Sequence, residues 1–182
     1  MPDPSVAIVL PPREGFGPNR VGAIGMLGRR YARVPGFQAR VYGGVQDGPI
    51  FPNVDFRPIK PTIFRLGPTN VRYAVSVANA LRDDPVDIVE VHNRPEIARA
   101  IADRLPKTPV ILILNNDPRE MRDAQTPAER ATLLGKLAAI LTSSTWLRDR
   151  YLEGIDRPAR QISVLPNCLD LTELPPPRAR ER

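Results

Sequence analysis

The sequence VDIVEVH occupies residues 86–92, and PVILILNN occupies residues 109–116. Both stretches are short and consist mostly of valine, isoleucine and leucine, as is typical of parallel strands that are buried on both faces. Between them, Asn93 is followed three positions later by Glu96, which predicts a capping box for a helix that runs through Arg104. A strand, a helix and a second strand in this order predict a parallel sheet with crossover helices.

The same alternation extends in both directions along the chain. Thr126, Pro127 and Glu129 mark the clearest helix start, because threonine caps a helix, proline suits its first position, and glutamate bonds back to the cap. Further strands are expected at residues 5–10, 37–44, 53–59, 138–144 and 162–166, and further helices at about 19–33, 69–83, 126–137 and 144–153. We therefore expect an α/β fold with a doubly wound, mainly parallel Rossmann-like sheet of about seven strands.

Length and composition bound the class of protein. The 182 residues suit one domain, which we place at residues 1–170, with a proline-rich linker or tail at 171–182. Apolar residues (42%) and charged residues (25%) occur in the proportions of a globular protein, which excludes a disordered or fibrous chain. Neither a membrane-spanning run nor a secretory signal is evident, and the single Cys168 excludes an internal disulfide. A cytoplasmic location is expected.

The chain is basic, with 26 Lys and Arg against 20 Asp and Glu, and all but three of the basic residues are arginine. Arginine suits phosphate and carboxylate partners, although a GC-rich genome would also favour arginine codons. The basic residues are scattered and aromatic residues are few, so no nucleic-acid partner is expected.

The loop after the first predicted strand contains Gly15-Phe16-Gly17. It lacks the third glycine of a dinucleotide-binding fingerprint, and the next strand ends in Tyr42-Gly43-Gly44 without an acidic residue for a ribose. What remains is either a plain turn or a glycine loop before a helix N-terminus, whose free amides favour an anion. Gly22, Gly25 and Gly28 are expected to let that helix pack close to the sheet.

Polar residues gather where strands end, which is where parallel sheets bind ligands. His92, the only histidine, ends one predicted strand and has either a structural or a ligand-binding role. The next strand leads into Asn115, Asn116, Asp117, Arg119, Glu120 and Arg122. Such a cluster suits ligands rich in hydroxyl groups, although Asn-Asp-Pro is also common in turns.

Several segments together resemble bacterial family 4 glycosyltransferases, in particular those that build lipopolysaccharide or exopolysaccharide. They are LPPREGFGP, VHNRPE, NNDPREMRDAQTPAER, TSSTWLRDRYLEGI and VLPNCLDL, and they extend over about residues 5–171. The resemblance implies one half of a GT-B fold, in which two Rossmann-like domains face each other across a cleft. It also implies retaining transfer of a sugar from a nucleotide-sugar, which is a substrate and not a cofactor, and no required metal.

The resemblance also implies roles for particular residues. His92 would lie beside the transferred sugar as the catalytic residue. The donor phosphates would lie near Glu14, Gly15, Phe16 and Gly17, and the acceptor side of the cleft would include Asn93, Arg94, Asn115, Asn116, Asp117, Arg119 and Arg122. Asn115 stands where relatives are expected to have a second histidine, so any role of that histidine is absent here.

We therefore expect the acceptor-binding half of a glycosyltransferase that acts on a glycan or glycolipid. Its partners would be a missing C-terminal donor-binding domain and a sugar acceptor. If the acceptor is a glycolipid, it would be lipid-linked, and the enzyme would reach it by peripheral contact with the inner membrane. Alone, the chain is expected to be inactive. The alternatives are a non-catalytic module that binds a nucleotide or sugar phosphate, and a free-standing α/β enzyme such as an epimerase, against which the incomplete fingerprint argues.

Overall fold

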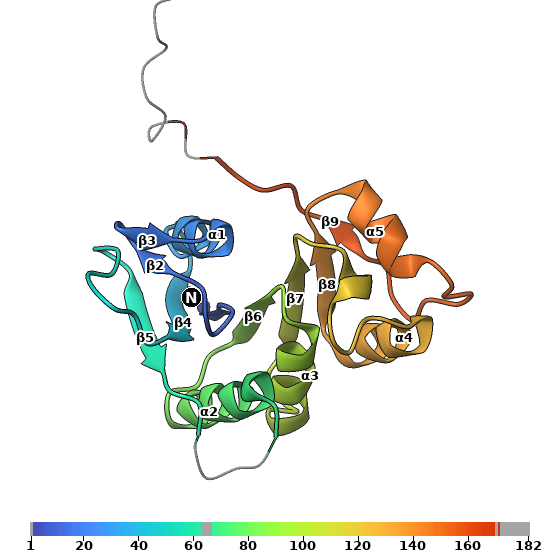
Figure 1. The fold of residues 1–182 in the computed structure, drawn as a ribbon, viewed down its shortest axis with the longest axis horizontal. Coiled ribbons are helices and arrows are strands. Elements are labelled where there is room, and N and C mark those ends of the chain that lie inside the picture. Colours follow the sequence, from blue (N-terminus) through green and yellow to red (C-terminus); the bar gives the residue numbers. More distant parts are fainter. Residues whose placement is uncertain (1, 63–66, 170, 172–182) are drawn as a thin grey trace, which may run out of the picture.

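The computed structural model of the protein describes residues 2–62, 67–169 and 171, and its centre is one parallel sheet (Figure 1). Seven strands follow the order β5-β4-β1-β6-β7-β8-β9. Their bounds are β1 (Ser5–Val9), β4 (Gln38–Gly44), β5 (Asp55–Ile59), β6 (Ile88–His92), β7 (Val110–Leu114), β8 (Ala139–Thr142) and β9 (Ser163–Val164). The predicted α/β class and all seven predicted strands are confirmed, and every pairing within this sheet is parallel.

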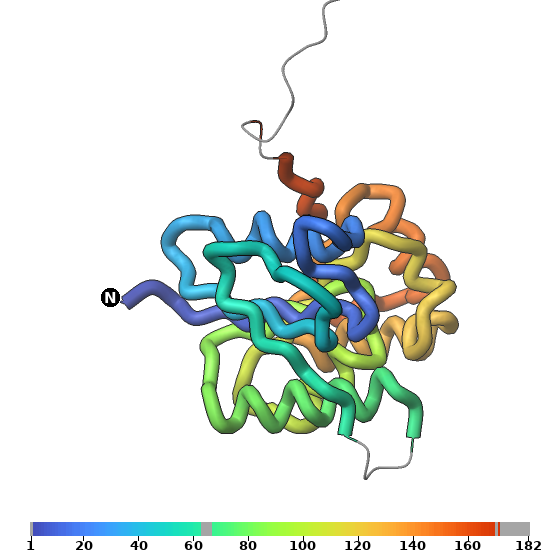
Figure 2. Tube along the Cα trace, turned by 60° about the vertical axis from the view of Figure 1, so that its left-hand side comes forward, coloured from blue at the N-terminus to red at the C-terminus, as the bar shows by residue number. Residues whose placement is uncertain are grey.

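Helices lie on both faces of this sheet. They are α1 (Ala23–Tyr31), α2 (Thr69–Asp83), α3 (Pro95–Arg104), α4 (Pro127–Lys136) and α5 (Thr145–Leu152), with a short 3-10 turn η1 (Pro118–Glu120). Side chains of α1 share a core with Val6 and Ile8 of β1, whereas those of α2, α3 and α4 share a larger core with Ala7 and Val9. Figure 2 shows α1 above the strands and α2 below them. The alternating directions of β1 side chains therefore serve two separate cores.

The caps of the last two helices follow the sequence pattern. The Thr126 hydroxyl accepts a hydrogen bond from the Glu129 amide, and the Glu129 carboxylate accepts one from the Thr126 amide, so the predicted capping box is formed. This hydrogen bond from the Thr126 amide holds the pKa of Glu129 below its usual value. Ser144 caps α5 through the Leu147 amide, and Gly154, at φ 78°, follows its end.

Two predicted helix starts are wrong. The segment after Gly15 forms a small antiparallel hairpin of β2 (Phe16–Gly17) and β3 (Arg20–Val21), so α1 begins at Ala23 and not near residue 19. Asn93 does not cap α3, since the cap position is Arg94 and no side chain caps it. Asn93 instead takes a left-handed backbone conformation (φ 50°), and its side chain bonds to the loop after β7.

The α1 face of the sheet is less covered than the sequence predicts. An apolar groove of about 430 Å³ runs beside α1 and is lined by Tyr31, Ile113 and Leu141, among others. Ile111 of β7 is half-buried there, although β7 was expected to be buried on both faces. Among the described residues, no helix is long and apolar enough to cross a membrane. The expected tail at 171–182 lies outside the described residues except for Leu171.

Candidate functional site

Three adjoining pockets hollow the surface beyond the carboxyl ends of β1, β4, β6 and β7. The arginine pocket (about 440 Å³) is lined by Pro12, Arg13, Pro68, Thr69, Asn70, Arg94 and Arg122. The central pocket (about 320 Å³) is lined by Pro11, Glu14, Ile24, Asn93, Arg94, Asn116, Asp117, Glu120 and Met121. The loop pocket (about 240 Å³) is lined by Pro12, Arg13, Glu14, Gly15, Arg20, Val45, Gln46 and Asp47. Because neighbouring pockets share lining residues, the three form one continuous polar surface.

Asn93 organises the centre of this surface. Its side-chain amide donates to Asn116 Oδ1 at 2.7 Å, and its Oδ1 accepts from the Asn115 backbone amide at 2.7 Å. The left-handed backbone of Asn93 suits asparagine better than most residues, because its short side chain bonds locally. Asn93 therefore fixes the loop after β6 against the loop after β7 and sets the direction of the Asn116 amide at the central pocket.

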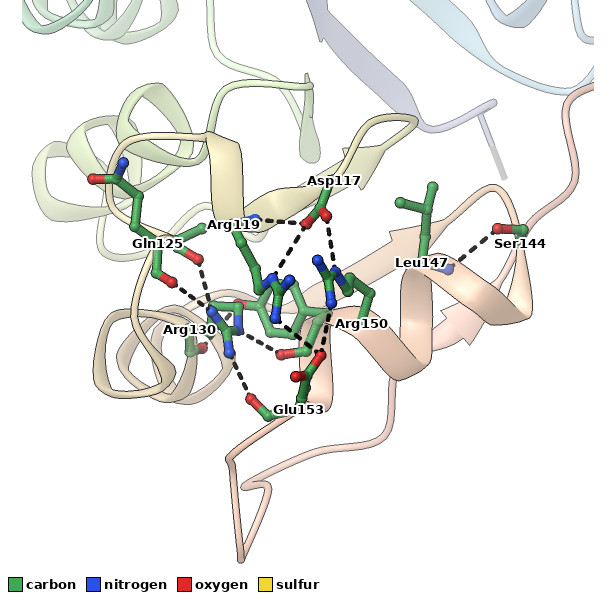
Figure 3. Close-up of polar contacts among 10 residues, drawn as sticks. Asp117, Arg119, Gln125, Arg130, Ser144, Leu147, Arg150 and Glu153 are labelled. Carbon is green, nitrogen blue, oxygen red and sulfur yellow. Dashed lines mark hydrogen bonds and ion pairs between the residues drawn. The ribbon is translucent and has the colours of Figure 1, made fainter.

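The wall formed by η1 is held by a charged network (Figure 3). Asp117 Oδ1 accepts from the Arg119 amide at 2.9 Å, and Asp117 Oδ2 accepts from Arg150 Nε at 2.8 Å. Arg119 Nη1 and Arg150 Nη1 both lie 3.1 Å from Glu153 Oε2. Asp117 thus caps η1 and ties it to α5, so its first role is to hold the pocket wall. Arg150 and Glu153 were not predicted from the sequence, because their proximity to Asp117 depends on how α5 packs against η1.

The predicted phosphate loop is only partly open. Glu14 Oε1 accepts a hydrogen bond of 2.9 Å from the Gly25 amide in the first turn of α1. A carboxylate of the chain itself therefore occupies this helix N-terminus, and the expectation of amides left free for an anion is wrong. Glu14 and Gly15 line the loop pocket, as expected for a loop at the cleft. Phe16 is fully buried against Phe51 and Phe56, so it belongs to a core and not to a binding surface.

Gly17 and a residue outside the motif complete this loop. A Cβ on Gly17 would lie 2.1 Å from the Pro49 carbonyl oxygen, so this glycine serves close packing of two loops. Gln46 Oε1 accepts from the Phe16 amide at 2.9 Å, and Gln46 Nε2 donates to the Glu14 carbonyl at 3.1 Å. Sequence reasoning missed Gln46, which lies 30 residues beyond Phe16 and is brought to the loop by β4.

His92 has no exposed surface among the described residues. Its Nε2 lies 2.5 Å from Glu90 Oε1, its ring centroid lies 5.7 Å from that of Tyr31, and its Nδ1 is buried without a hydrogen-bond partner in the described chain. Burial, with smaller effects of Cys168 and Glu90, raises the pKa of Tyr31 to about 12, so this neighbour is uncharged near neutral pH. His92 lines none of the three pockets, and a role at the transferred sugar stays a prediction.

We expect His92→Ala to lower the free energy of unfolding by about 1–2 kcal/mol, because it leaves a cavity beside Tyr31 and removes the partner of Glu90. Urea denaturation of the 182-residue chain measures this change. Asn79→Ala, at an exposed position of α2, is the control and should change stability by less than about 0.5 kcal/mol. An unchanged midpoint for His92→Ala would favour the catalytic role and contradict the structural one.

The structure gathers most of the expected acceptor-side residues but not all of them. Asn93, Arg94, Asn116, Asp117 and Arg122 line the arginine or central pocket. Asn115 and Arg119 line neither pocket. The side-chain amide of Asn115 is buried without a partner among the described residues, and the guanidinium of Arg119 lies 3.1 Å from Glu153 Oε2. In the described part of the chain, no group of three or more His, Cys, Asp or Glu side chains could hold a metal ion.

Comparisons with known proteins agree with this geometry. A family model described as Glycosyltransferase Family 4 matches residues 24–173. The chain is similar to the crystal structure of a UDP-N-acetylglucosamine 2-epimerase, with a TM-score of 0.55, 16% identity and coverage of 85% of this chain and 46% of the other. It is also similar to HepE of Anabaena in complex with UDP-glucose, with a TM-score of 0.57, 10% identity and coverage of 92% and 45%. A search of curated protein sequences gave no match. The chain spans about half the length of these two structures and corresponds to one half of a GT-B fold.

Proposed function

Since this chain belongs to glycosyltransferase family 4, we propose that it supplies the acceptor-binding half of a hexosyltransferase or related glycosyltransferase. The complete enzyme would move a sugar from a nucleotide-sugar donor to a glycan or glycolipid acceptor during lipopolysaccharide or exopolysaccharide synthesis. In this proposal residues 1–170 form the domain and residues 171–182 lead toward the donor-binding half.

The observation that carries the proposal is the continuous polar surface of the three pockets. It lies at the carboxyl edge of the sheet, which is where open α/β sheets bind ligands. The central pocket presents the Asn116 amide together with the carboxylates of Asp117 and Glu120. Amide and carboxylate groups each form two or more hydrogen bonds, which suits the adjacent hydroxyl groups of a sugar.

The reaction needs an acceptor hydroxyl held against the donor sugar. The hydroxyl oxygen bonds to the anomeric carbon, the bond from that carbon to the donor phosphate breaks, and the hydroxyl proton passes to the departing phosphate oxygen. The central pocket would position the acceptor, and such orientation of two reactants accounts for much of the rate of an enzyme reaction. A role of His92 beside the transferred sugar stays part of this proposal, although His92 is fully buried in the described chain.

The other half of the active site would come from a second domain. The chain covers only 46% and 45% of the two structures it matches, which supports a two-domain enzyme with a donor-binding partner domain. We further propose a cytoplasmic enzyme that contacts the inner membrane peripherally when its acceptor is lipid-linked. The support for this location is the motif resemblance and the excess of arginine over acidic residues.

We expect the isolated 182-residue chain to show no transferase turnover and to bind UDP-glucose no more tightly than about millimolar. The reason is that one wall of the cleft cannot orient both reactants, and the Gly25 amide in the first turn of α1 is already bonded to Glu14. Calorimetric titration and a product assay measure the two quantities. A submicromolar dissociation constant would contradict this proposal and favour the non-catalytic nucleotide-binding module.

A further inference from the structure

We propose that the arginine pocket binds a phosphate group carried by the acceptor, so that the acceptor is a phosphorylated sugar. This inference rests on the proposed function and names the class of acceptor that the polar surface selects. It uses the two ends of that surface, which differ in charge.

The lining of the arginine pocket is positively charged. Arg13, Arg94 and Arg122 line it, and none of the described residues in its lining is acidic. Arg94 Nη1 donates to the Asn93 carbonyl oxygen at 2.6 Å, which fixes this guanidinium at the boundary with the central pocket. Neither Arg13 nor Arg122 has a side-chain hydrogen bond or ion pair to another described residue. Three guanidinium groups without a carboxylate among them favour a dianion such as a phosphate monoester.

The N-terminal end of α2 opens on the same pocket. Helix α2 has 15 residues, its cap position is Pro68, no side chain caps it, and its first turn contains no acidic residue. Among the described residues, no side chain therefore accepts from its first backbone amides, which lie beside Thr69 and Asn70 of the pocket lining. This situation is the opposite of that at α1, where Glu14 occupies the N-terminus.

One carboxylate, that of Glu96, lies near this helix end and is bonded to Asn70 of the pocket lining. Glu96 Oε1 accepts a hydrogen bond from the Asn70 side chain at 2.5 Å, so Asn70 stands between this carboxylate and the pocket. Glu96 is buried and does not line the pocket. Among the described residues that line the arginine pocket, only the three arginines carry a charge, so the lining is positively charged.

The arginine pocket is continuous with the central pocket. Arg94 lines both pockets, so a ligand that places a phosphate against Arg94 extends its sugar toward Asn116 and Asp117. The acidic side chains Glu14, Asp117 and Glu120 all line the central pocket, where they suit hydroxyl groups and disfavour an anion. The surface therefore fixes the orientation of a sugar phosphate, with the phosphate at one end and the hydroxyls at the other.

Calorimetric titration of the 182-residue chain with glucose 6-phosphate and with glucose tests this inference. We expect glucose 6-phosphate to bind at least about tenfold more tightly than glucose, by roughly 1.4 kcal/mol or more. Arg122→Ala and Arg13→Ala should each weaken glucose 6-phosphate about tenfold and leave glucose unchanged. The matched control, Arg160→Ala at an exposed position before β9, should leave both affinities unchanged. Raising the salt concentration should weaken only the phosphorylated ligand.

A second arm distinguishes a soluble sugar phosphate from a lipid headgroup. Sedimentation with phosphatidylcholine vesicles containing phosphatidylinositol, repeated with Arg122→Ala, assigns the phosphate to a lipid if binding depends on Arg122. Vesicles that do not bind, together with tight glucose 6-phosphate binding, assign it to a soluble acceptor.

Equal affinities for glucose and glucose 6-phosphate would overturn the inference and leave the acceptor-binding function intact. Tighter binding of UDP-glucose than of glucose 6-phosphate, with the same dependence on Arg122, would overturn it by assigning the pocket to the donor. Failure of all three ligands to bind would count against the proposed function as well.

Discussion

Replacing Arg130 by methionine is expected to lower the free energy of unfolding by about 3–5 kcal/mol, a loss typical of breaking a buried charged network. Arg130 is only 1% exposed, although it carries a charge. Its guanidinium donates to the carbonyl oxygens of Tyr151 (2.7 Å), Ala124 (3.1 Å), Gln125 (2.9 Å) and Glu153 (2.6 Å) (Figure 3). Methionine would fill much of the volume but leave these oxygens without a donor.

The location of these carbonyl groups explains why a buried arginine is tolerated. Tyr151 and Glu153 lie at the C-terminal end of α5, where unpaired carbonyls and the helix dipole favour a cation. Ala124 and Gln125 precede the start of α4. Arg130 therefore joins the start of α4 to the end of α5 without a buried carboxylate.

Urea denaturation of the 182-residue chain measures this prediction against a matched arginine. Arg148→Met, on the exposed side of α5 and paired with Asp149, should change the free energy of unfolding by no more than about 1 kcal/mol. A loss for Arg130→Met no greater than that for Arg148→Met would show that the carbonyl network adds little to stability.

Gly25→Ala is expected to destabilise the chain by about 1–3 kcal/mol. A Cβ on Gly25 would lie 2.2 Å from the Gly15 carbonyl oxygen, which is backbone and cannot rotate away. The loop would have to move, and the bond from the Gly25 amide to Glu14 would lengthen with it. The cost of this clash and of the loop movement exceeds the stabilisation that alanine normally gives in a helix through its higher helix propensity.

Gly135→Ala is the matched control, since Gly135 also lies in a helix but has no atom within 4 Å of its added Cβ. We expect this variant to stabilise the chain by about 0.4–1 kcal/mol. Thermal unfolding of both variants measures the contrast. If both variants shifted the melting temperature in the same direction, the close packing of α1 against the loop would be contradicted.

Most of the fold was predictable because its signals are local. Short aliphatic runs identified β1, β6, β7, β8 and β9, weaker patterns at residues 37–44 and 53–59 identified β4 and β5, and Thr126 and Ser144 identified the starts of α4 and α5. The predicted start of α1 was wrong because a hairpin over Phe16–Val21 precedes the helix. This hairpin depends on the packing of Phe16 against Phe51 and Phe56, which come from a later loop and strand. The predicted cap at Asn93 was wrong because the Asn93 side chain bonds to the loop after β7. A capping pattern in the sequence does not reveal such a bond between distant segments.

The sequence predicted where in the fold the candidate site lies, but it predicted fewer of the contacts within the site. Asn93, Arg94 and Asn116 were predicted from the strand ends, and they line the same pocket because the carboxyl ends of parallel strands share one edge. The occupation of the α1 N-terminus by Glu14 could not be predicted, since it depends on the path of the loop before the hairpin. The Arg13 side of the surface was missed because Pro68 and Asn70 reach it from a distant segment.

The measurement that tests the central claim most directly is the map of backbone amide shifts in the 15N-labelled chain during titration with glucose and N-acetylglucosamine. If the polar surface is the acceptor site, the largest shifts will lie at Asn93, Arg94, Asn116 and Glu120, which line the central pocket. Shifts confined to the apolar groove beside Tyr31, or spread evenly over the chain, would contradict the claim.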